Sequence, residues 1–383
     1  MTRYPQDQAA RPGTGAAGAT TGAPATAIIV THNSARELAR ALDPLLRAGL
    51  AVRVVDNAST DGTPAIVARD FPAVHLTVNE VNVGFARAVN QAFTGVGTDV
   101  VLLVNPDCEV PAETAYELVG LLRRRPEVGI AGPRLLGRDG RVAISAHPFE
   151  SLTSVLASRF GGALVPVALR RLVSGRRRRD AYDACRRPAA PVPVDWLSGA
   201  CLAVRASVLR DIGGLDEGYF LYYEDEELCL QAWRRGAEVV YLPTVRATHV
   251  GGASSADPSW IWPHLYRSLL RFFARHRPRS YPLVRVAVLL RAVLGIGLAG
   301  IRLGMRPRAA ATRARAWTGV ARIALTADPE RLRATADPVL PPATADPERP
   351  HATTVADRPH TTTVPERVTA TPELLERRPP CTS

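Results

Sequence analysis

The sequence contains no lysine, so its strongly basic side chains are all arginine. Arginine numbers 48 against 36 acidic residues, which gives a formal net charge of +12. This balance favours anionic partners, such as phosphates or an anionic membrane face. Aromatic residues are scarce as well, at 6%. Because the arginines are not interleaved with aromatic residues and no known module is present, nucleic acid is not expected as a partner.

Cysteine is also sparse. The five cysteines are scattered and never occur with CxxC spacing. Neither a disulfide framework nor a zinc site is therefore indicated. The N-terminal stretch has no charged-then-apolar signal pattern, so we expect a reduced, cytoplasmic setting.

Long apolar runs are missing too. The most apolar stretch, residues 292–301, lies between Arg291 and Arg302 and is only ten residues long. A membrane span needs about 20 apolar residues, so the sequence predicts no transmembrane helix. We expect instead a basic helical segment that lies on the membrane surface. The protein would then be peripheral on the inner face of the cell membrane.

Residues 27–125 alternate strand and helix signals. Apolar runs such as "AIIV" (27–30) indicate buried strands, and "FARAVNQAF" (85–93) indicates a helix. Ser34 and Glu37 fit a capping box that would begin a helix at "SARELARAL". The alternation predicts an α/β fold with a mostly parallel sheet and helices on both faces.

Changes in composition divide the chain into four parts. Residues 1–25 are small, polar and rich in Pro and Gly, which predicts disorder. Residues 26–257 carry the α/β pattern, with a basic loop at 160–193. Residues 258–325 are the helical segment. Residues 326–383 repeat "TADP", are rich in Pro and Thr, and are predicted to be disordered.

Polar residues follow two of the predicted strands. Asp56 ends a strand in "VVDNASTDGT", and Asn105 and Asp107 follow another in "LLVNPDC". Ligand sites of open α/β sheets gather at such strand ends. Asp56 can accept hydrogen bonds from a nucleobase or ribose, and Asp107 with Asn105 can hold a divalent cation that in turn holds a diphosphate. Both stretches also suit ordinary turns.

The stretch "NVGFARAVN" (82–90) is a candidate phosphate site. Gly84 permits close backbone approach, and a predicted helix N-terminus follows it. Arg87 can neutralise a phosphate. A plain strand-to-helix loop is the alternative.

A cluster of aromatic and acidic residues, "FLYYEDEE" (220–227), is the candidate catalytic element. Glu224 or Asp225 can act as a general base, and partial burial by neighbouring tyrosines would keep its pKa useful. Glu226 and Glu227 also suit the first turn of a helix, where the macrodipole favours acids.

His249 follows a predicted strand and precedes two glycines. A lone histidine is usually not a metal ligand. Asp107 also ends a strand, so we expect the two residues to share a site.

Taken together, these stretches resemble the family 2 glycosyltransferases, particularly bacterial rhamnosyltransferases that act on polyprenyl-diphosphate-linked sugars. The ordered set covers roughly residues 27–255. It consists of "AIIVTHNSARELARAL", "VVDNASTDGT", "NVGFARAVN", "LLVNPDC", "WLSGACLAVRASVLRDIGGLDEGYFLYYEDEELCLQAWRRGAEVVYLP" and "ATHVGGAS".

The resemblance implies a nucleotide-sugar-binding fold of the GT-A type and a role for each motif. The family's metal-binding DXD corresponds to Asn105-Pro106-Asp107, with Asp107 as the main ligand, and His249 matches a histidine that completes the metal site in some relatives. The metal would be Mg²⁺ or Mn²⁺. Asp225 would be the base, with Glu224 as the alternative. The implied donor nucleotide site is Thr31, Asn33, Asp56, Gly84 and Arg87, and the implied acceptor side is Trp196, Ser198 and Gly199.

The activity that the resemblance implies is an inverting hexosyl transfer. The donor would be a nucleotide sugar, with dTDP-rhamnose expected, and the acceptor a hydroxyl of a polyprenyl-diphosphate-linked saccharide in cell-envelope synthesis. A galactofuranosyl or other hexosyl nucleotide is the alternative donor. A non-catalytic protein that binds a sugar nucleotide is the alternative from another class.

Overall fold

The apolar segments of the sequence form a mixed sheet in the computed structural model, which describes residues 22–160, 190–251, 258–302 and 307–334. The strands are β1 (Thr26–Thr31), β2 (Ala51–Asn57), β3 (His75–Asn79), β4 (Val100–Val104), β5 (Cys108–Glu109), β6 (Val128–Leu136), β7 (Val142–Ala143), β8 (Ala146–His147), β9 (Val192–Pro193), β10 (Trp196–Leu197), β11 (Cys201–Arg205) and β12 (Glu238–His249). In this part of the chain, ten of the strands share one sheet, whose main path is β3-β2-β1-β4-β11-β6-β12-β5. Strands β8 and β10 pair separately.

The sheet is parallel in its first half and mixed in its second. Strand β1 pairs in parallel with β2 and β4, and β2 does so with β3. Strand β11 is antiparallel to both of its neighbours, β4 and β6. Strand β12 returns parallel to β6. The predicted α/β fold, a mixed and mostly parallel sheet with flanking helices, is confirmed.

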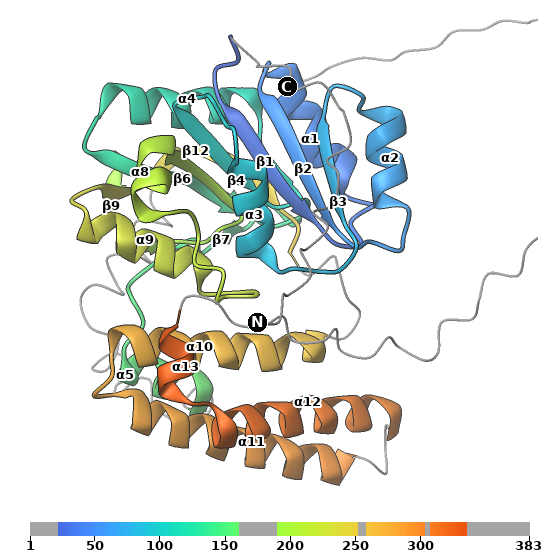
Figure 1. The fold of residues 1–383 in the computed structure, drawn as a ribbon, viewed down its shortest axis with the longest axis vertical. Coiled ribbons are helices and arrows are strands. Elements are labelled where there is room, and N and C mark those ends of the chain that lie inside the picture. The colour runs from blue at the N-terminus through green and yellow to red at the C-terminus, as the bar shows by residue number, and fades with distance from the viewer. Residues whose placement is uncertain (1–21, 161–189, 252–257, 303–306, 335–383) are drawn as a thin grey trace, which may run out of the picture. The chain divides into compact units, whose positions relative to one another are not determined.

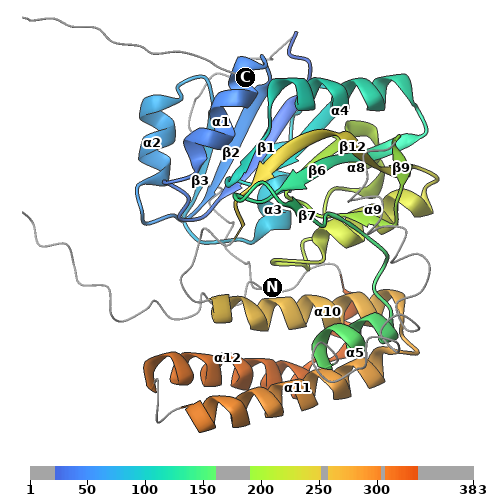
Figure 2. The ribbon, with the colours of Figure 1, turned by 180° about the vertical axis from the view of Figure 1, so that it is seen from behind.

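Helices cover both faces of this sheet (Figure 1, and from behind in Figure 2). They are α1 (Leu38–Arg47), α2 (Thr63–Asp70), α3 (Phe85–Phe93), α4 (Ala112–Arg124), α8 (Ala206–Ile212) and α9 (Glu224–Arg234), whereas α5 (Leu152–Phe160) packs with the C-terminal helices. Side chains of β1 alternate between two cores because successive residues of a strand point to opposite faces. Ala27 and Ile29 join the core with α1 and α4, whereas Ile28 and Val30 join the core with α3, α8 and α9.

A third core belongs to the C-terminal helices. These are the 3-10 turn η1 (Pro258–Ile261), α10 (Trp262–His276), α11 (Tyr281–Arg302), α12 (Pro307–Thr326) and α13 (Pro329–Arg333). Two tyrosines from the segment before α9, Tyr219 and Tyr223, are buried in this core. The C-terminal helices therefore pack directly against the segment that delivers the acidic pair.

Helix α11 is longer than the apolar stretch 292–301, whose length predicted no transmembrane helix. It spans 22 residues because its two internal arginines face α12. Arg285 donates to the carbonyl oxygens of Ala324 and Leu325, and Arg291 lies 4.3 Å from the ring centre of Trp317. By length and composition, its segment 281–301 is long and apolar enough to cross a membrane. Its exposed aliphatic residues are Leu283, Val286, Leu290, Val293, Leu294, Leu298 and Ile301.

Two local predictions are wrong. The capping box at Ser34 does not form: α1 begins at Leu38 with no side-chain cap, because the Ser34 backbone N–H bonds Thr63 Oγ1 and its hydroxyl bonds the His32 carbonyl. The start of the predicted disordered tail forms α13, because Asp328 caps it by accepting from Glu330 N at 2.9 Å. Most of the predicted basic loop (160–193) lies outside the described residues. The same is true of most of the two segments that were predicted to be disordered, 1–25 and 326–383.

Candidate active site

A cleft of about 540 Å³ opens at the carboxyl ends of β1 and β4 and at the N-terminus of α9. Most of the predicted site residues line this cleft. They are Thr31, Gly84, Asn105, Asp107, Trp196, Ser198, Gly199, Glu224, Asp225 and His249. Asn33, Asp56 and Arg87 were predicted as well but are not among its lining residues.

The pairing of β5 with β12 brings the candidate metal ligands together. Cys108 of β5 lies opposite His249, and this register sets Asp107 beside the imidazole. His249 Nε2 lies 3.2 Å from Asp107 Oδ1, and Asn105 Nδ2 lies 3.5 Å from the same nitrogen. The backbone N–H of Gly251 donates to the other oxygen, Asp107 Oδ2, at 3.1 Å.

These donors fit a divalent cation with open coordination positions. Burial acts to raise the pKa of Asp107, but the hydrogen bond and charge of His249 outweigh it, and the pKa lies below its usual value. The carboxylate is therefore anionic at neutral pH, as a ligand must be. Among the described residues, no group of three or more His, Cys, Asp or Glu side chains is placed to hold a metal ion. Water or substrate oxygens would have to complete the coordination of a cation bound here.

The acidic pair sits at the end of a strained turn. Tyr222 and Tyr223 have φ values of 67° and 72°, in the left-handed region that non-glycine residues rarely adopt. Helix α9 then begins at Glu224. Asp225 accepts hydrogen bonds from two backbone N–H groups, those of Gly199 and Glu226, each at 2.9 Å.

The two acids differ in burial and in partners. Glu224 is 8% exposed, and its Oε2 is buried without a hydrogen-bond partner in the described structure. Burial and the neighbouring Asp225 charge raise the pKa of Glu224 well above its usual range. Burial also raises the pKa of Asp225, but the N–H groups of Gly199 and Glu226 favour the anion and oppose the rise. Asp225 is therefore the more readily ionised of the two carboxyls.

Glu226 and Glu227 lie in the first turn of α9, as the sequence predicts. Both are buried. Glu226 accepts from the backbone N–H of Glu150 at 2.7 Å. Glu227 pairs with His276 at 2.5 Å. These two acids hold other parts of the chain in place.

Asp56, predicted to contact a nucleoside, has protein partners in this structure. Asp56 is fully buried. Its carboxylate accepts from the hydroxyls of Thr31 at 2.7 Å and Ser59 at 2.6 Å, and from the Ser59 backbone N–H at 2.9 Å. It therefore orients Thr31, which does line the cleft. Asn33 accepts from Thr60 N at 2.8 Å and braces the same loop.

At the predicted phosphate site, the start of α3 contacts Phe220. Gly84 has φ 87°, and a Cβ there would lie 2.8 Å from the Phe220 carbonyl oxygen. That oxygen already accepts from the N–H of Phe85, the first residue of α3. Arg87 forms an ion pair with Glu217 at 2.9 Å. The glycine is required by the close approach of Phe220, and Arg87 is committed to a protein carboxylate.

The predicted acceptor side lies next to Asp225. Trp196 stacks on His147 with ring centres 4.4 Å apart, and its indole N–H donates to the Pro148 carbonyl. Gly199 gives its N–H to Asp225, and a Cβ at this position would lie 3.4 Å from that side chain. This loop is therefore in direct contact with the acidic pair.

Sequence reasoning missed several lining residues. On the donor side they are His32, Asn57 and Asn82; near the acidic pair they are Phe220, Trp260, Ile261 and Leu265. The aromatic run before the acidic pair was a usable signal for Phe220, which stacks on His264 with ring centres 4.5 Å apart. No sequence signal pointed to Trp260, Ile261 and Leu265, because they lie in the segment that was predicted to lie on the membrane surface.

The sequence profile of "Glycosyl transferase family 2" matches residues 26–178 of the chain. The chain is also 31% identical over 265 residues to the N-acetylglucosaminyl-diphospho-decaprenol L-rhamnosyltransferase of Mycobacterium tuberculosis, an alignment that covers 65% of this chain and 84% of that protein. The chain therefore belongs to glycosyl transferase family 2 and is a glycosyltransferase.

Other proteins are similar to this chain over shorter stretches or at lower identity. The low-salt glycan biosynthesis hexosyltransferase Agl10 of Haloferax volcanii is 26% identical over 200 residues, which is 51% of this chain and 57% of that protein. The rhamnosyltransferase WbbL of Escherichia coli is 37% identical over 87 residues, or 22% of this chain and 32% of that protein. Among solved structures, a Pyrobaculum calidifontis mannosyltransferase in complex with GDP-Man and Mn²⁺ aligns over 79% of this chain and 87% of its own, with 18% identity and a TM-score of 0.45.

Proposed function

We propose that the protein is an inverting rhamnosyltransferase that uses dTDP-rhamnose and a hydroxyl of a polyprenyl-diphosphate-linked saccharide. One observation carries the proposal: a single cleft contains both the Asp107–His249 pair and Asp225. A group transfer from a nucleotide diphosphate needs a means to stabilise the leaving diphosphate and a base for the acceptor hydroxyl. The names of the mycobacterial and E. coli relatives support rhamnose as the sugar.

The proposed cofactor is a divalent cation, Mg²⁺ or Mn²⁺, held by Asp107 and His249 with Asn105 beside them. Among the described residues that line the cleft there is no arginine. A nucleotide diphosphate would therefore find no permanent side-chain cation there, although the chain as a whole is strongly basic. When bound, the cation supplies charge stabilisation of the diphosphate. Carboxylate and carbonyl ligands suit both metals, and the imidazole tolerates Mn²⁺.

The proposed base is Asp225, with Glu224 as a neutral neighbour. Asp225 would take the proton of the acceptor hydroxyl while that oxygen attacks the anomeric carbon. The bond between this carbon and the diphosphate breaks in the same step, and the nucleotide diphosphate leaves with the electron pair. Attack from the face opposite the leaving group inverts the anomeric centre. The Gly199 N–H holds Asp225 in position for this transfer.

The proposed acceptor is amphipathic. Trp196, Ser198 and Gly199 offer a ring and polar groups for a saccharide. Trp260, Ile261 and Leu265 add an apolar wall to the same cleft, which suits the lipid-proximal part of a polyprenyl-linked acceptor. The name of the mycobacterial relative includes a decaprenol-linked sugar.

We further propose a peripheral position on the inner face of the cell membrane. Helix α11 exposes seven large aliphatic side chains, each at least half exposed. Helix α12 follows with four exposed arginines and no acidic residue. An apolar face beside basic residues fits the interface of an anionic leaflet.

A donor screen against a polyprenyl-diphosphate-GlcNAc acceptor tests the function. The native protein should give a product whose mass increases by one deoxyhexose with dTDP-rhamnose, and NMR coupling constants of the product should show an inverted anomeric configuration. If the protein instead forms a product with another hexosyl nucleotide, that nucleotide replaces dTDP-rhamnose as the proposed donor. Nucleotide-sugar binding without any transfer would instead favour a non-catalytic binding protein.

A further inference from the structure

Helix α10 follows the predicted catalytic domain, yet one of its faces contacts the segment that carries the acidic pair. The contacting residues are Ser268, Arg271, Arg275 and His276, which recur at helical spacing on one side of the helix. Each of them has a partner between Asp216 and Glu227. The inference below rests on the proposed role of Asp225 as the base.

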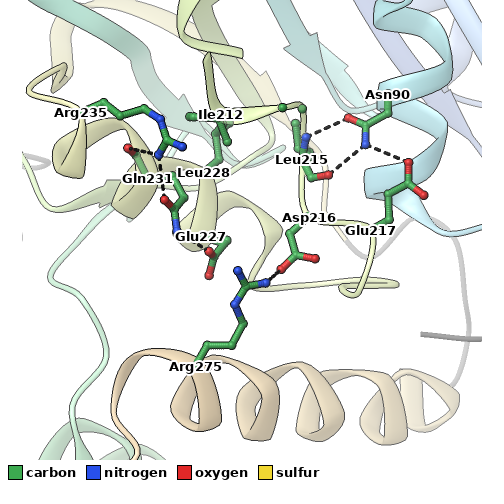
Figure 3. A pocket seen from close by; sticks show the side chains of 12 residues that line it. Asn90, Ile212, Leu215, Asp216, Glu217, Glu227, Leu228, Gln231, Arg235 and Arg275 are labelled. Carbon is green, nitrogen blue, oxygen red and sulfur yellow. Dashed lines mark hydrogen bonds and ion pairs between the residues drawn. The ribbon is translucent and has the colours of Figure 1, made fainter. Parts of the chain in front are cut away.

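The first contact is an arginine pair on Asp216. Arg271 is fully buried and donates from Nη2 to both oxygens of Asp216, at 2.7 and 2.9 Å. Arg275 reaches the same carboxylate from the next turn of α10 (Figure 3). A Cβ on Gly218 would lie 2.1 Å from the Arg271 guanidinium carbon. The loop is therefore closely fitted to this helix, and Arg271 cannot be replaced without leaving a buried carboxylate less well compensated.

The second contact is on α9 itself, one turn from its start. Glu227 Oε2 pairs with His276 Nε2 at 2.5 Å and accepts from the Tyr219 hydroxyl at 3.1 Å. Its other oxygen accepts from Gln231 at 2.8 Å. Glu227 lies two residues after Asp225 on the same helix. The position of His276 therefore restricts how the start of α9 can move.

The third contact supports the strained turn. The Ser268 hydroxyl donates to the carbonyl oxygen of Leu221 at 3.0 Å. Leu221 directly precedes Tyr222 and Tyr223, the two residues in the left-handed region. Such backbone conformations persist only where the surrounding structure holds them. Here that structure includes α10.

We propose that α10 is part of the active site and positions Asp225. Arg275, His276 and Ser268 act as positioning residues: they hold the loop, the first turn of α9 and the strained turn, and so fix the carboxylate against the Gly199 N–H. This assignment changes the predicted division of the chain, in which residues from 258 onward only contact the membrane.

Arg275→Ala tests the proposal, with Arg285→Ala as its matched control. Arg285 makes an interaction of similar kind, to the Ala324 and Leu325 carbonyl oxygens, but does not touch residues 216–227. Both variants loosen the C-terminal helices. We expect only Arg275→Ala to lower kcat, by about 10- to 100-fold, with the donor KM unchanged. Arg275→Lys keeps the cation and should restore most of the loss.

A second readout does not depend on activity. Hydrogen–deuterium exchange of peptides that cover residues 219–230 should rise in Arg275→Ala and stay at the native level in Arg285→Ala. If Arg275→Ala does not fold, Ser268→Ala replaces it, since this variant removes only the bond to Leu221. Equal kcat values or equal exchange in the test and control variants would overturn the proposal. A native protein that transfers no sugar would refute the proposed function, and the exchange comparison would still decide whether α10 positions the turn.

Discussion

Replacement of Asp225 by asparagine is the most direct test of the proposed chemistry. Asparagine keeps the size of the side chain but cannot accept a proton at neutral pH. A positioned general base contributes about 10²–10⁴ in rate, so we expect kcat for transfer to fall by that factor. Thr31, Asp107 and His249 lie elsewhere in the cleft, so the donor KM should stay near the native value.

The substitution also has a calculable cost in stability. Both oxygens of Asp225 accept backbone N–H groups, from Gly199 and Glu226. Asparagine has one carbonyl oxygen, so one of these N–H groups loses its acceptor. Hydrogen bonds to a charged group contribute about 1.5–3 kcal/mol, and we expect the free energy of unfolding to fall by about 2 kcal/mol. Activity should therefore be compared well below the melting temperature of both proteins.

Glu224→Gln is the control. Burial and the Asp225 charge raise the pKa of Glu224 and so favour its neutral form, which glutamine resembles. This variant should keep most of the transfer activity. Burial also raises the pKa of Asp225. Native kcat/KM should therefore increase with pH through a value above that of an exposed aspartate, and this limb should be absent in Asp225→Asn. An equal or larger loss in Glu224→Gln would refute the assignment of the base.

Four further outcomes are expected. Glu227→Gln should lower the free energy of unfolding at pH 7 by about 3 kcal/mol, because the pKa of Glu227 is lowered from 4.5 to about 2 and each unit is worth about 1.4 kcal/mol. In chemical denaturation, this difference from the native protein should shrink as the pH falls from 4.5 towards 2. A pH-independent difference would contradict the prediction. Chelation by EDTA should abolish sugar transfer, and added Mg²⁺ or Mn²⁺ should restore it. The Asp107→Asn variant should need a higher metal concentration for the same activity. Full activity in EDTA would exclude the cation. Gly84→Ala should destabilise the protein in thermal melts, because its Cβ would lie 2.8 Å from the Phe220 carbonyl oxygen. The double variant Leu290→Ser, Leu294→Ser should float less with anionic vesicles than the native protein, and unchanged flotation would remove α11 from the membrane contact.

The fold was predictable because it depends on local patterns. Buried strands such as β1 and β4 are short apolar runs, and α3 has the predicted bounds of 85–93. The approach of Asp107 to His249 was also within reach, because both residues follow or end strands whose carboxyl ends lie at the same edge of the sheet. The antiparallel position of β11 between β4 and β6 could not be predicted, because the sequence of an apolar strand does not indicate its direction in the sheet.

The roles of Asp56 and Arg87 were beyond sequence reasoning for a physical reason. A carboxylate or guanidinium at a strand end or helix start can bind a ligand or another side chain, and the choice depends on which partner the fold brings near. Ser59 and Thr31 satisfy Asp56, and Glu217 satisfies Arg87. The contribution of α10 was hidden likewise, because Arg275 and Asp216 are far apart in the sequence.

The contact between Gly84 and Phe220 has a thermodynamic consequence for the two ligands. The Phe220 carbonyl caps the first turn of α3 on the nucleotide side, while the same residue begins the turn that leads to Asp225. Any shift of that turn to admit one substrate must stretch or break this cap. The affinities of donor and acceptor should then depend on each other, and the protein should prefer a fixed order of substrate binding.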